Sequence, residues 1–406
     1  MNFTFDGSMP REVLNNYLSR AVTHCGIGYD GILTSHTFED DLRMFKHMGA
    51  KFIGRAAFVW STGDDDKNHF TFCEQRAHVA HAYDSELILQ ACVFECIYKP
   101  FVNSVEIPEF VFKAFDLPYE KRFFNYSDMI FINGKFVNQW GKDGSVEDIT
   151  RLESRMWIFY RAACYIKAGY EGIHFGQVCL IGANDNGFKY WRKVILMLRE
   201  YAKKNARRHY VLFDAHTLGD LRLNTEFFDY NAFPIRLKEI LDKPMECICE
   251  EGYLDSMFNE IDGHCRPFIV EFDNFGGSDF SGKPNHKSHF AWGYDEITWF
   301  SLQSDEYRHS FLRYIWKWVN ERYSEGWVQM PSRRVLTKSI EFVWEKPDIK
   351  WLGKVSYDEC FKYEIDKNET AHIKRGYYSA NNKSDACPFG YGDEDVISEL
   401  FNEIQS

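Results

Sequence analysis

Short apolar runs alternate with longer stretches of helical periodicity along most of the chain. Apolar residues that recur at three- and four-residue spacing predict helices near 37–49, 71–83, 150–169, 188–202 and 304–320. The apolar runs between them predict strands. The eight predicted strands are 16–24, 50–60, 87–97, 171–181, 210–216, 227–233, 267–273 and 326–330.

Strands that alternate with helices pair in parallel, and eight such strands are typical of a closed (β/α)8 TIM barrel. We therefore expect an α/β barrel domain over residues 1–340. A long aromatic segment at 99–147 interrupts the alternation and is interpreted as a loop above the third strand. Residues 341–406 do not continue the alternation. They predict a small C-terminal extension, either packed on the barrel or a partly ordered tail that ends in a short helix near 394–403.

Polar residues stand late in several predicted strands. Because the active site of such a barrel lies at the carboxyl ends of its strands, these residues are the candidates for chemistry. The seventh strand is the clearest case, since Glu271 and Asp273 follow the apolar run Phe268–Val270 and share one face of the strand. The other candidates are Arg55 on the second strand, Glu95 on the third, His174 and Gln177 on the fourth, and Asp214 and His216 on the fifth.

These residue types suit the cleavage of a glycosidic bond. That reaction needs one carboxyl group to protonate the leaving oxygen and a second to attack the anomeric carbon or activate water. The catalytic candidates are Glu271, Asp214 and Glu95. The residues expected to bind sugar hydroxyls or tune the carboxylates are Arg55, His174, Gln177, His216 and Asp273. For a single carboxylate taken alone, a structural ion pair is the alternative.

Aromatic residues make up 17% of the chain, a surplus that serves either a core or a surface on which sugars stack. Trp60 ends the second strand, Trp140 lies in the aromatic segment, and Trp292 lies in the loop after the seventh strand. We predict these three as sugar-stacking residues, with plain packing as the alternative for each. Gly276, Gly277 and Gly282 in that loop suit a lid or a substrate subsite, and a surface loop is the alternative.

At the level of architecture, residues 14–340 resemble the large group of (β/α)8-barrel glycoside hydrolases. The likeness is carried by Gly54-Arg55, Glu95, the run Gly172–Gln177 and the run Ile269–Asp273. No specific family is identified. The resemblance implies that Glu271 is the nucleophile. It also implies a Glu acid/base at the end of the fourth strand, where this chain has Gln177. Either the acid is Asp214 or Glu95, or the enzyme inverts, or the protein does not hydrolyse.

Two other functions stay open on the same fold. The first is a metal-dependent sugar isomerase or epimerase. A divalent metal accepts ligands of the residue types and spacing found in Asp214, His216, His174 and Glu271. The absence of a Glu at position 177 suits a carbohydrate-binding barrel without catalysis. The leading hypothesis, a glycosidase, includes no metal and no cofactor.

The net charge limits the classes of partner that the chain can bind, and the cysteines indicate its compartment. A net charge of −12 without a basic block argues against nucleic acid, and no apolar run reaches transmembrane length. The 11 cysteines form no regular framework, so we expect buried free thiols in a reducing compartment, and no signal peptide is visible. We therefore expect a cytoplasmic protein whose partner is an oligosaccharide or glycoside substrate. The oligomeric state is left open.

Overall fold

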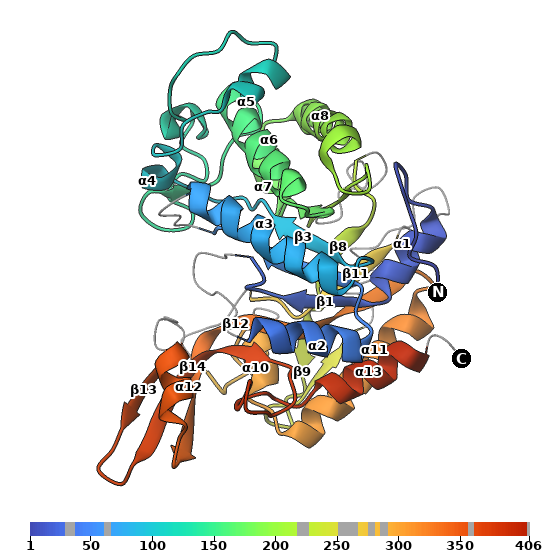
Figure 1. The fold of residues 1–406 in the computed structure, drawn as a ribbon, viewed down its shortest axis with the longest axis vertical. Coiled ribbons are helices and arrows are strands. Elements are labelled where there is room, and N and C mark those ends of the chain that lie inside the picture. The colour runs from blue at the N-terminus through green and yellow to red at the C-terminus, as the bar shows by residue number, and fades with distance from the viewer. Residues whose placement is uncertain are drawn as a thin grey trace.

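The computed structural model describes residues 1–28, 37–60, 66–216, 227–250, 267–274, 281–284, 291–355 and 361–403. Its strands lie in the middle of the molecule, with helices above and below them in the view of Figure 1. An arm of strands projects at one corner. The fold is a mixed α/β structure around a central, mostly parallel sheet.

The central sheet has ten strands, of which β13 and β14 pair antiparallel and the remaining eight pair in parallel. The eight run in the order β8-β11-β12-β1-β2-β3-β6-β7. Their bounds are β1 (Ala21–His24), β2 (Phe52–Ala57), β3 (Ile88–Cys92), β6 (Gly172–His174), β7 (Leu212–Asp214), β8 (Asn231–Pro234), β11 (Phe268–Glu271) and β12 (Gly326–Glu345). The prediction of eight parallel strands from the apolar runs is confirmed.

The two ends of this row, β7 and β8, are joined by backbone hydrogen bonds. The amide of Asp229 donates to the carbonyl of Phe213 at 2.8 Å, and that of Ala232 donates to the carbonyl of Ala215 at 3.3 Å. Each strand of the row is short and buried along its length, apart from β12, whose far half leaves the core. The carboxyl ends of the strands therefore gather polar side chains from different parts of the chain.

Several predicted strands are wrong at their bounds, and the first, fourth and third show why. Residues 16–18 belong to helix α1 (Arg11–Leu18), because Val13, Leu14, Tyr17 and Leu18 form one buried helical face, and the strand starts only at Ala21. The fourth strand ends at His174, where Gly176 adopts a φ of +60° and a helical turn, α7 (Val178–Ile181), follows. The third ends at Cys92, so Glu95 lies in the loop beyond it.

Helices follow most of the parallel strands in chain order. They are α2 (Phe38–Met48), α3 (Asp66–Tyr83), α6 (Leu152–Lys167), α8 (Lys189–Asn205), α10 (Glu296–Ser301) and α11 (Asp305–Arg322). Their ends carry local signals: Gly49 closes α2 in the left-handed region with a φ of 71°, and the side chain of Ser304 caps α11 by accepting from the amide of Tyr307. The helices predicted from periodicity are thus present, each with small shifts at its ends.

The long aromatic segment after β3 folds over α6. It contains α4 (Lys99–Val102), α5 (Glu109–Ala114), the 3₁₀ turn η1 (Tyr126–Asp128) and a small hairpin of β4 (Ile97–Tyr98) with β5 (Gly144–Ser145). Its rings pack on the helix, as in the edge-to-face contact of Phe124 with Trp157 at 5.0 Å. In Figure 1 it forms the upper corner of the molecule. Much of the aromatic surplus is therefore core.

The chain after residue 326 makes an arm and then returns to the main body. The arm consists of the far half of β12 with β14 (Thr370–Ser379), β13 (Phe361–Ile365) and α12 (Ile349–Val355). The last described helix, α13 (Glu394–Glu403), packs against α2 and α11. There Arg43 donates twice to Glu394, at 2.9 Å each, and the rings of Trp316 and Phe401 are in contact. The domain boundary at 340 stays a prediction, and β12 runs across it.

A separate small hairpin joins β9 (Leu237–Glu239) to β10 (Cys247–Cys249) after β8. Among the described helices, none has both the length and the apolar character needed to cross a bilayer.

Candidate active site

Glu271, the last residue of β11, is the centre of the site. Its side chain is only 2% exposed, and it receives hydrogen bonds from Arg55, from Nη1 of Arg334 at 2.8 Å and from the hydroxyl of Thr23 at 3.2 Å. Burial by itself would raise the pKa of this carboxyl group, but the charges of Arg55 and Arg334 and the hydrogen bonds from Arg55 lower it well below its ordinary value. Glu271 is therefore a buried, fully ionised carboxylate.

Arg55 reaches Glu271 because the backbone of β2 bends at this point. Its φ is +54°, in the left-handed region, and its amide donates to Oε1 of Gln90 at 3.0 Å. The residue before it is Gly54, and a Cβ there would lie 1.7 Å from Nε2 of the buried Gln329, so that side chain would have to move. The pair Gly54-Arg55 is thus a local device that turns a guanidinium group toward the seventh strand.

Arg334 on β12 is the second cation, and the sequence interpretation missed it. Its Nη2 donates to Oδ1 of Asn274 at 2.6 Å and lies 3.8 Å from Oδ1 of Asp273. The predicted eighth strand stops at Met330, directly before Pro331. The observed strand continues past Pro331 and places Arg334 next to Glu271. Gln329, one of the polar residues on the strand, is buried and donates to the carbonyl of Val22.

Asp214 and His174 form a second buried pair beside Glu271. Nδ1 of His174 lies 2.7 Å from Oδ2 of Asp214. Oδ1 of Asp214 accepts from Nε2 of Gln90 at 2.8 Å and from the hydroxyl of Tyr230 at 2.9 Å. Both oxygens of Asp214 are thus committed to protein donors. Gln90 touches both Asp214 and Arg55, so it ties the two groups together.

His216 lies between these two groups. Its ring stacks edge-to-face on that of His174, with centroids 4.8 Å apart, and its Nε2 is 3.9 Å from Oε1 of Glu271. Burial, together with the neighbouring His174 and Arg55, holds the pKa of His216 well below its usual range. His216 is therefore neutral. Its Nε2 has no hydrogen-bond partner among the described residues.

Glu95 stands in the loop after β3 and is bound to Gln177, which lies just beyond the fourth strand. Its Oε2 accepts from the amide of Gln177 at 2.9 Å, and its Oε1 accepts from the side-chain amide of Gln177 at 2.8 Å. Nearby Glu147 is fully buried, and burial followed by the charge of Glu95 raises its pKa to about 8. Nothing in the periodicity of the aromatic segment singled out Glu147.

Two of the three tryptophans predicted to stack on sugar lie together near the site. The rings of Trp60 and Trp140 are 5.3 Å apart, and Trp60 contacts Phe94, which in turn contacts His174 at 5.7 Å. Nε1 of Trp140 donates to the carbonyl of Glu95. Trp292 is placed elsewhere: it is 3% exposed and donates from Nε1 to the carbonyl of Glu246, next to the β9–β10 hairpin.

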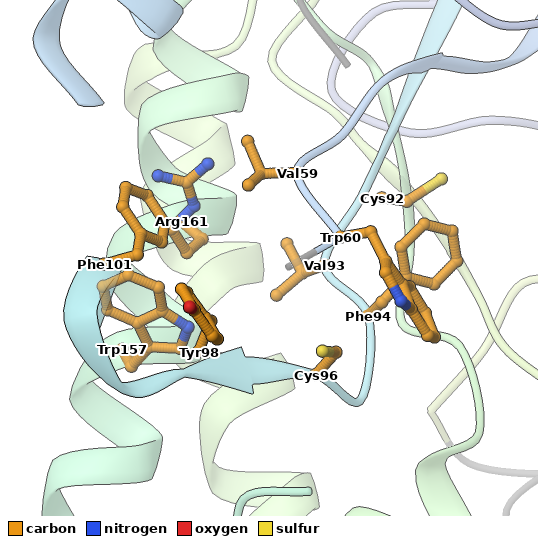
Figure 2. Close-up of a pocket in the computed structure, with 10 residues that line it drawn as sticks. All are labelled: Val59, Trp60, Cys92, Val93, Phe94, Cys96, Tyr98, Phe101, Trp157 and Arg161. Carbon is orange, nitrogen blue, oxygen red and sulfur yellow. The ribbon is translucent and has the colours of Figure 1, made fainter. Parts of the chain in front are cut away.

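A cavity of about 20 Å³ lies behind Trp60 and Phe94, on the side of α6 (Figure 2). Val59 and Val93 line its middle, and Arg161 and Trp157 of α6 close its far side. This volume holds about one water molecule. The cavity is therefore too small for a sugar ring.

Glu296 supports the site from behind. Its two oxygens accept from the amides of Leu237 and Asp273, at 3.1 and 3.0 Å. Burial raises the pKa of this carboxyl group to about 7. It fixes the backbone immediately after β11, and with it the positions of Asp273 and Asn274. The short apolar helix that carries Glu296 gave no sequence signal for this role.

The metal hypothesis finds little geometric support in the part of the chain that the structure describes. The single group of three ligand residues whose donor atoms lie within 4.8 Å of one another is His47, Glu394 and Asp395, on the outer surface of α2 and α13. The set Asp214, His216, His174 and Glu271 does not meet that distance, and Asp214 and Glu271 are already bound by protein donors.

Comparison with known proteins gives structural matches alone. No family model matches the chain, and no curated protein matches its sequence. A debranching enzyme of Nostoc punctiforme shares 12% identity at a TM-score of 0.35, covering 57% of this chain and 53% of that one. Trehalose-6-phosphate hydrolase of Bacillus licheniformis shares 12% at 0.37, covering 64% and 58%. The glycoside hydrolase domain of PelA from Pseudomonas aeruginosa shares 10% at 0.31, covering 62% and 83%.

These solved structures are glycoside hydrolases, the group that the sequence resembles. The match spans about half the length of the debranching enzyme.

Proposed function

We propose that the eight parallel strands close into a (β/α)8 barrel and that the chain is a glycoside hydrolase that acts through Glu271. The observation that carries the proposal is the state of this carboxylate. It is buried at the carboxyl end of the seventh strand and is kept ionised by Arg55 and Arg334. A fixed carboxylate of this kind attacks an anomeric carbon, or takes a proton from water, without first losing a proton.

The surrounding residues suit a sugar. Trp60 and Trp140 offer faces for ring stacking, and Asp273 with Asn274 offers acceptors for hydroxyl groups next to Glu271. Among the described residues, Arg55 and Arg334 are balanced by Glu271 and Asp273, so these four residues leave no excess of positive charge that would call for an anionic substrate. We therefore propose a neutral oligosaccharide or glycoside as the substrate.

Replacement of Glu271 by Gln tests the role of this carboxylate. The wild type is first screened on a panel of aryl glycosides and oligosaccharides. Glu271→Gln should lower kcat per folded molecule by at least about 10³-fold, because the amide can neither attack nor act as a base at this position. Sugar binding, measured by calorimetry, should persist in the variant.

Glu171 provides a matched control at the opposite end of the fourth strand. It is also a buried carboxylate held by two arginines, Arg207 and Arg208, each at 2.6 Å. Glu171→Gln disturbs a pair of the same kind and should leave kcat per folded molecule within about threefold of the wild type. The proposal fails if Glu271→Gln stays active. Binding of sugars by the wild type without turnover would instead indicate a carbohydrate-binding barrel.

A further inference from the structure

His174 has a fixed tautomer. Its Nδ1 faces Oδ2 of Asp214 at 2.7 Å, and a carboxylate oxygen can only accept, so Nδ1 carries the proton. Asp214 cannot turn away, because Gln90 and Tyr230 hold its other oxygen. Both partners are buried, His174 with 2% of its side chain exposed and Asp214 with none. The basic nitrogen of the imidazole is therefore Nε2.

That second nitrogen has no partner. Nε2 of His174 is buried and makes no hydrogen bond with any described residue. Leaving a buried polar atom unsatisfied costs about 1–3 kcal/mol. A protein tolerates this cost where a ligand group is to be bound, and the position of His174 at the end of the fourth strand is where a barrel substrate would lie.

The groups around His174 have distinct charges. Asp214 is the anion behind it, and Tyr230 supports that anion. His216, which is neutral, packs against its ring and separates it from Glu271. On its other side Phe94 lies between His174 and the guanidinium of Arg55, which sits 5.3 Å from the Phe94 ring. The imidazole thus has an anion next to Nδ1, while Nε2 has no partner among the described residues and is available to a ligand.

We propose that His174 is the catalytic residue that exchanges a proton with the glycosidic oxygen, and that Asp214 is its positioning residue. The inference rests on the proposed hydrolase activity. Protonated His174 gives its Nε2 proton to the leaving oxygen while the bond from C1 to that oxygen breaks and its electron pair moves to the oxygen. Glu271, or water deprotonated by Glu271, forms the new bond to C1. Where Glu271 is bound to C1, neutral His174 takes a proton from a second water as that water bonds to C1, and the bond from C1 to Glu271 breaks with its electron pair returning to the carboxylate. Where Glu271 has instead deprotonated the attacking water, it gives that proton to solvent and His174 takes a proton from solvent.

The resemblance to glycoside hydrolases implies an acid at the end of the fourth strand, and Gln177, which stands just beyond that strand, cannot supply a proton in this way. The other two carboxylates predicted as acids are both occupied: Asp214 by three donors and Glu95 by the two amide groups of Gln177. His174 reaches into the site from the same strand on which an acid/base is expected.

Substrates that differ in their need for a proton test the proposal. An alkyl glycoside needs protonation of its leaving oxygen, whereas a glycosyl fluoride of the same sugar leaves without it. His174→Gln should lower kcat/KM for the alkyl glycoside by about 10²–10⁴-fold, the usual contribution of a general acid. For the fluoride, kcat/KM should fall by less than about tenfold. His78→Gln, an exposed histidine on α3, is the matched control and should change neither value.

Asp214→Asn tests the positioning role and guards against a His174 variant that fails to fold. It should reproduce the split between the two substrates, because an amide no longer fixes the tautomer or balances the imidazolium charge. Suppose that the wild type is active, that Glu271→Gln is inactive, and that His174→Gln and Asp214→Asn each lose the same activity on both substrates. This result would overturn the role of His174 and would leave the proposed hydrolase activity standing. A wild type that cleaves no glycoside overturns the hydrolase, and this inference with it.

Discussion

Replacement of Arg334 by Met measures what holds the central carboxylate in the core. Unit charges about 4 Å apart interact by about 4 kcal/mol at an effective dielectric constant of about 20, and removing one partner of a buried pair costs about 3–5 kcal/mol. The guanidinium of Arg334 donates to Glu271 at 2.8 Å, and both side chains are 2% exposed. Since Arg55 still pairs with Glu271 in the variant, we expect the lower end, a loss of about 3 kcal/mol at pH 7.

The loss is measured from urea unfolding curves at pH 7. The exposed pair of Arg313 with Glu399 supplies the control, because surface pairs contribute about 0–1 kcal/mol. Arg313→Met should therefore lower stability by less than 1 kcal/mol. A double-mutant cycle with Glu271→Gln should give a coupling of about 2 kcal/mol or more. Equal effects of the two arginine replacements, or a coupling near zero, would refute the role given to Arg334.

The pH dependence of this coupling follows from the lowered pKa of Glu271. A carboxyl group whose folded pKa is depressed stabilises the protein fully above its unfolded pKa, about 4.3, and this contribution is lost as pH falls toward the folded value. The coupling between Glu271 and Arg334 should therefore be constant from pH 8 to about pH 5 and should decline below that range.

Two further predictions concern residues around the site. A Cβ on Gly54 would lie 1.7 Å from Nε2 of Gln329. Gly54→Ala should therefore lower the free energy of unfolding in urea by about 1–3 kcal/mol and lower kcat by displacing Arg55. The control is Gly353→Ala, where a Cβ meets no atom within 4 Å, and it should change neither value. Burial raises the pKa of Glu147 to about 8, so the wild type should lose stability as pH rises from about 4.5 to 8; a Glu147→Gln variant with the same slope would contradict this.

The fold was largely predictable because buried parallel strands appear as apolar runs. That signal located all eight strands, including β11, which carries Glu271. It failed where one pattern has two interpretations: the apolar residues at 13–18 fit a helical face as well as a strand. It also failed at the end of the eighth strand, which was predicted to stop at Met330 although β12 continues past Pro331. Tertiary pairing with β1 and β14 carries the strand past that residue.

The candidate site was predictable where residues share the ends of strands. Arg55, His174, Asp214, His216, Glu271 and Asp273 were predicted individually, and the structure brings them into one polar network. Their pairing was not predictable, because it depends on which strand ends face one another. Gln90, Tyr230 and Arg334 have ordinary sequence surroundings and acquire their roles only through contacts with residues distant in the chain. Trp292 lay in the predicted loop but packs away from the network.

The contact of α13 with α2 also has a consequence for synthesis of the protein on the ribosome. The partner of Arg43, Glu394, is 351 residues later in the chain, and the partner of His24 on β1, Ser332, is 308 residues later. At about 5–20 residues per second, roughly 18–70 s pass between the synthesis of Arg43 and that of Glu394, and α2 lacks its contact with α13 for that time. We therefore expect the yield of the protein in cells to depend on chaperones that bind the incomplete chain during this interval.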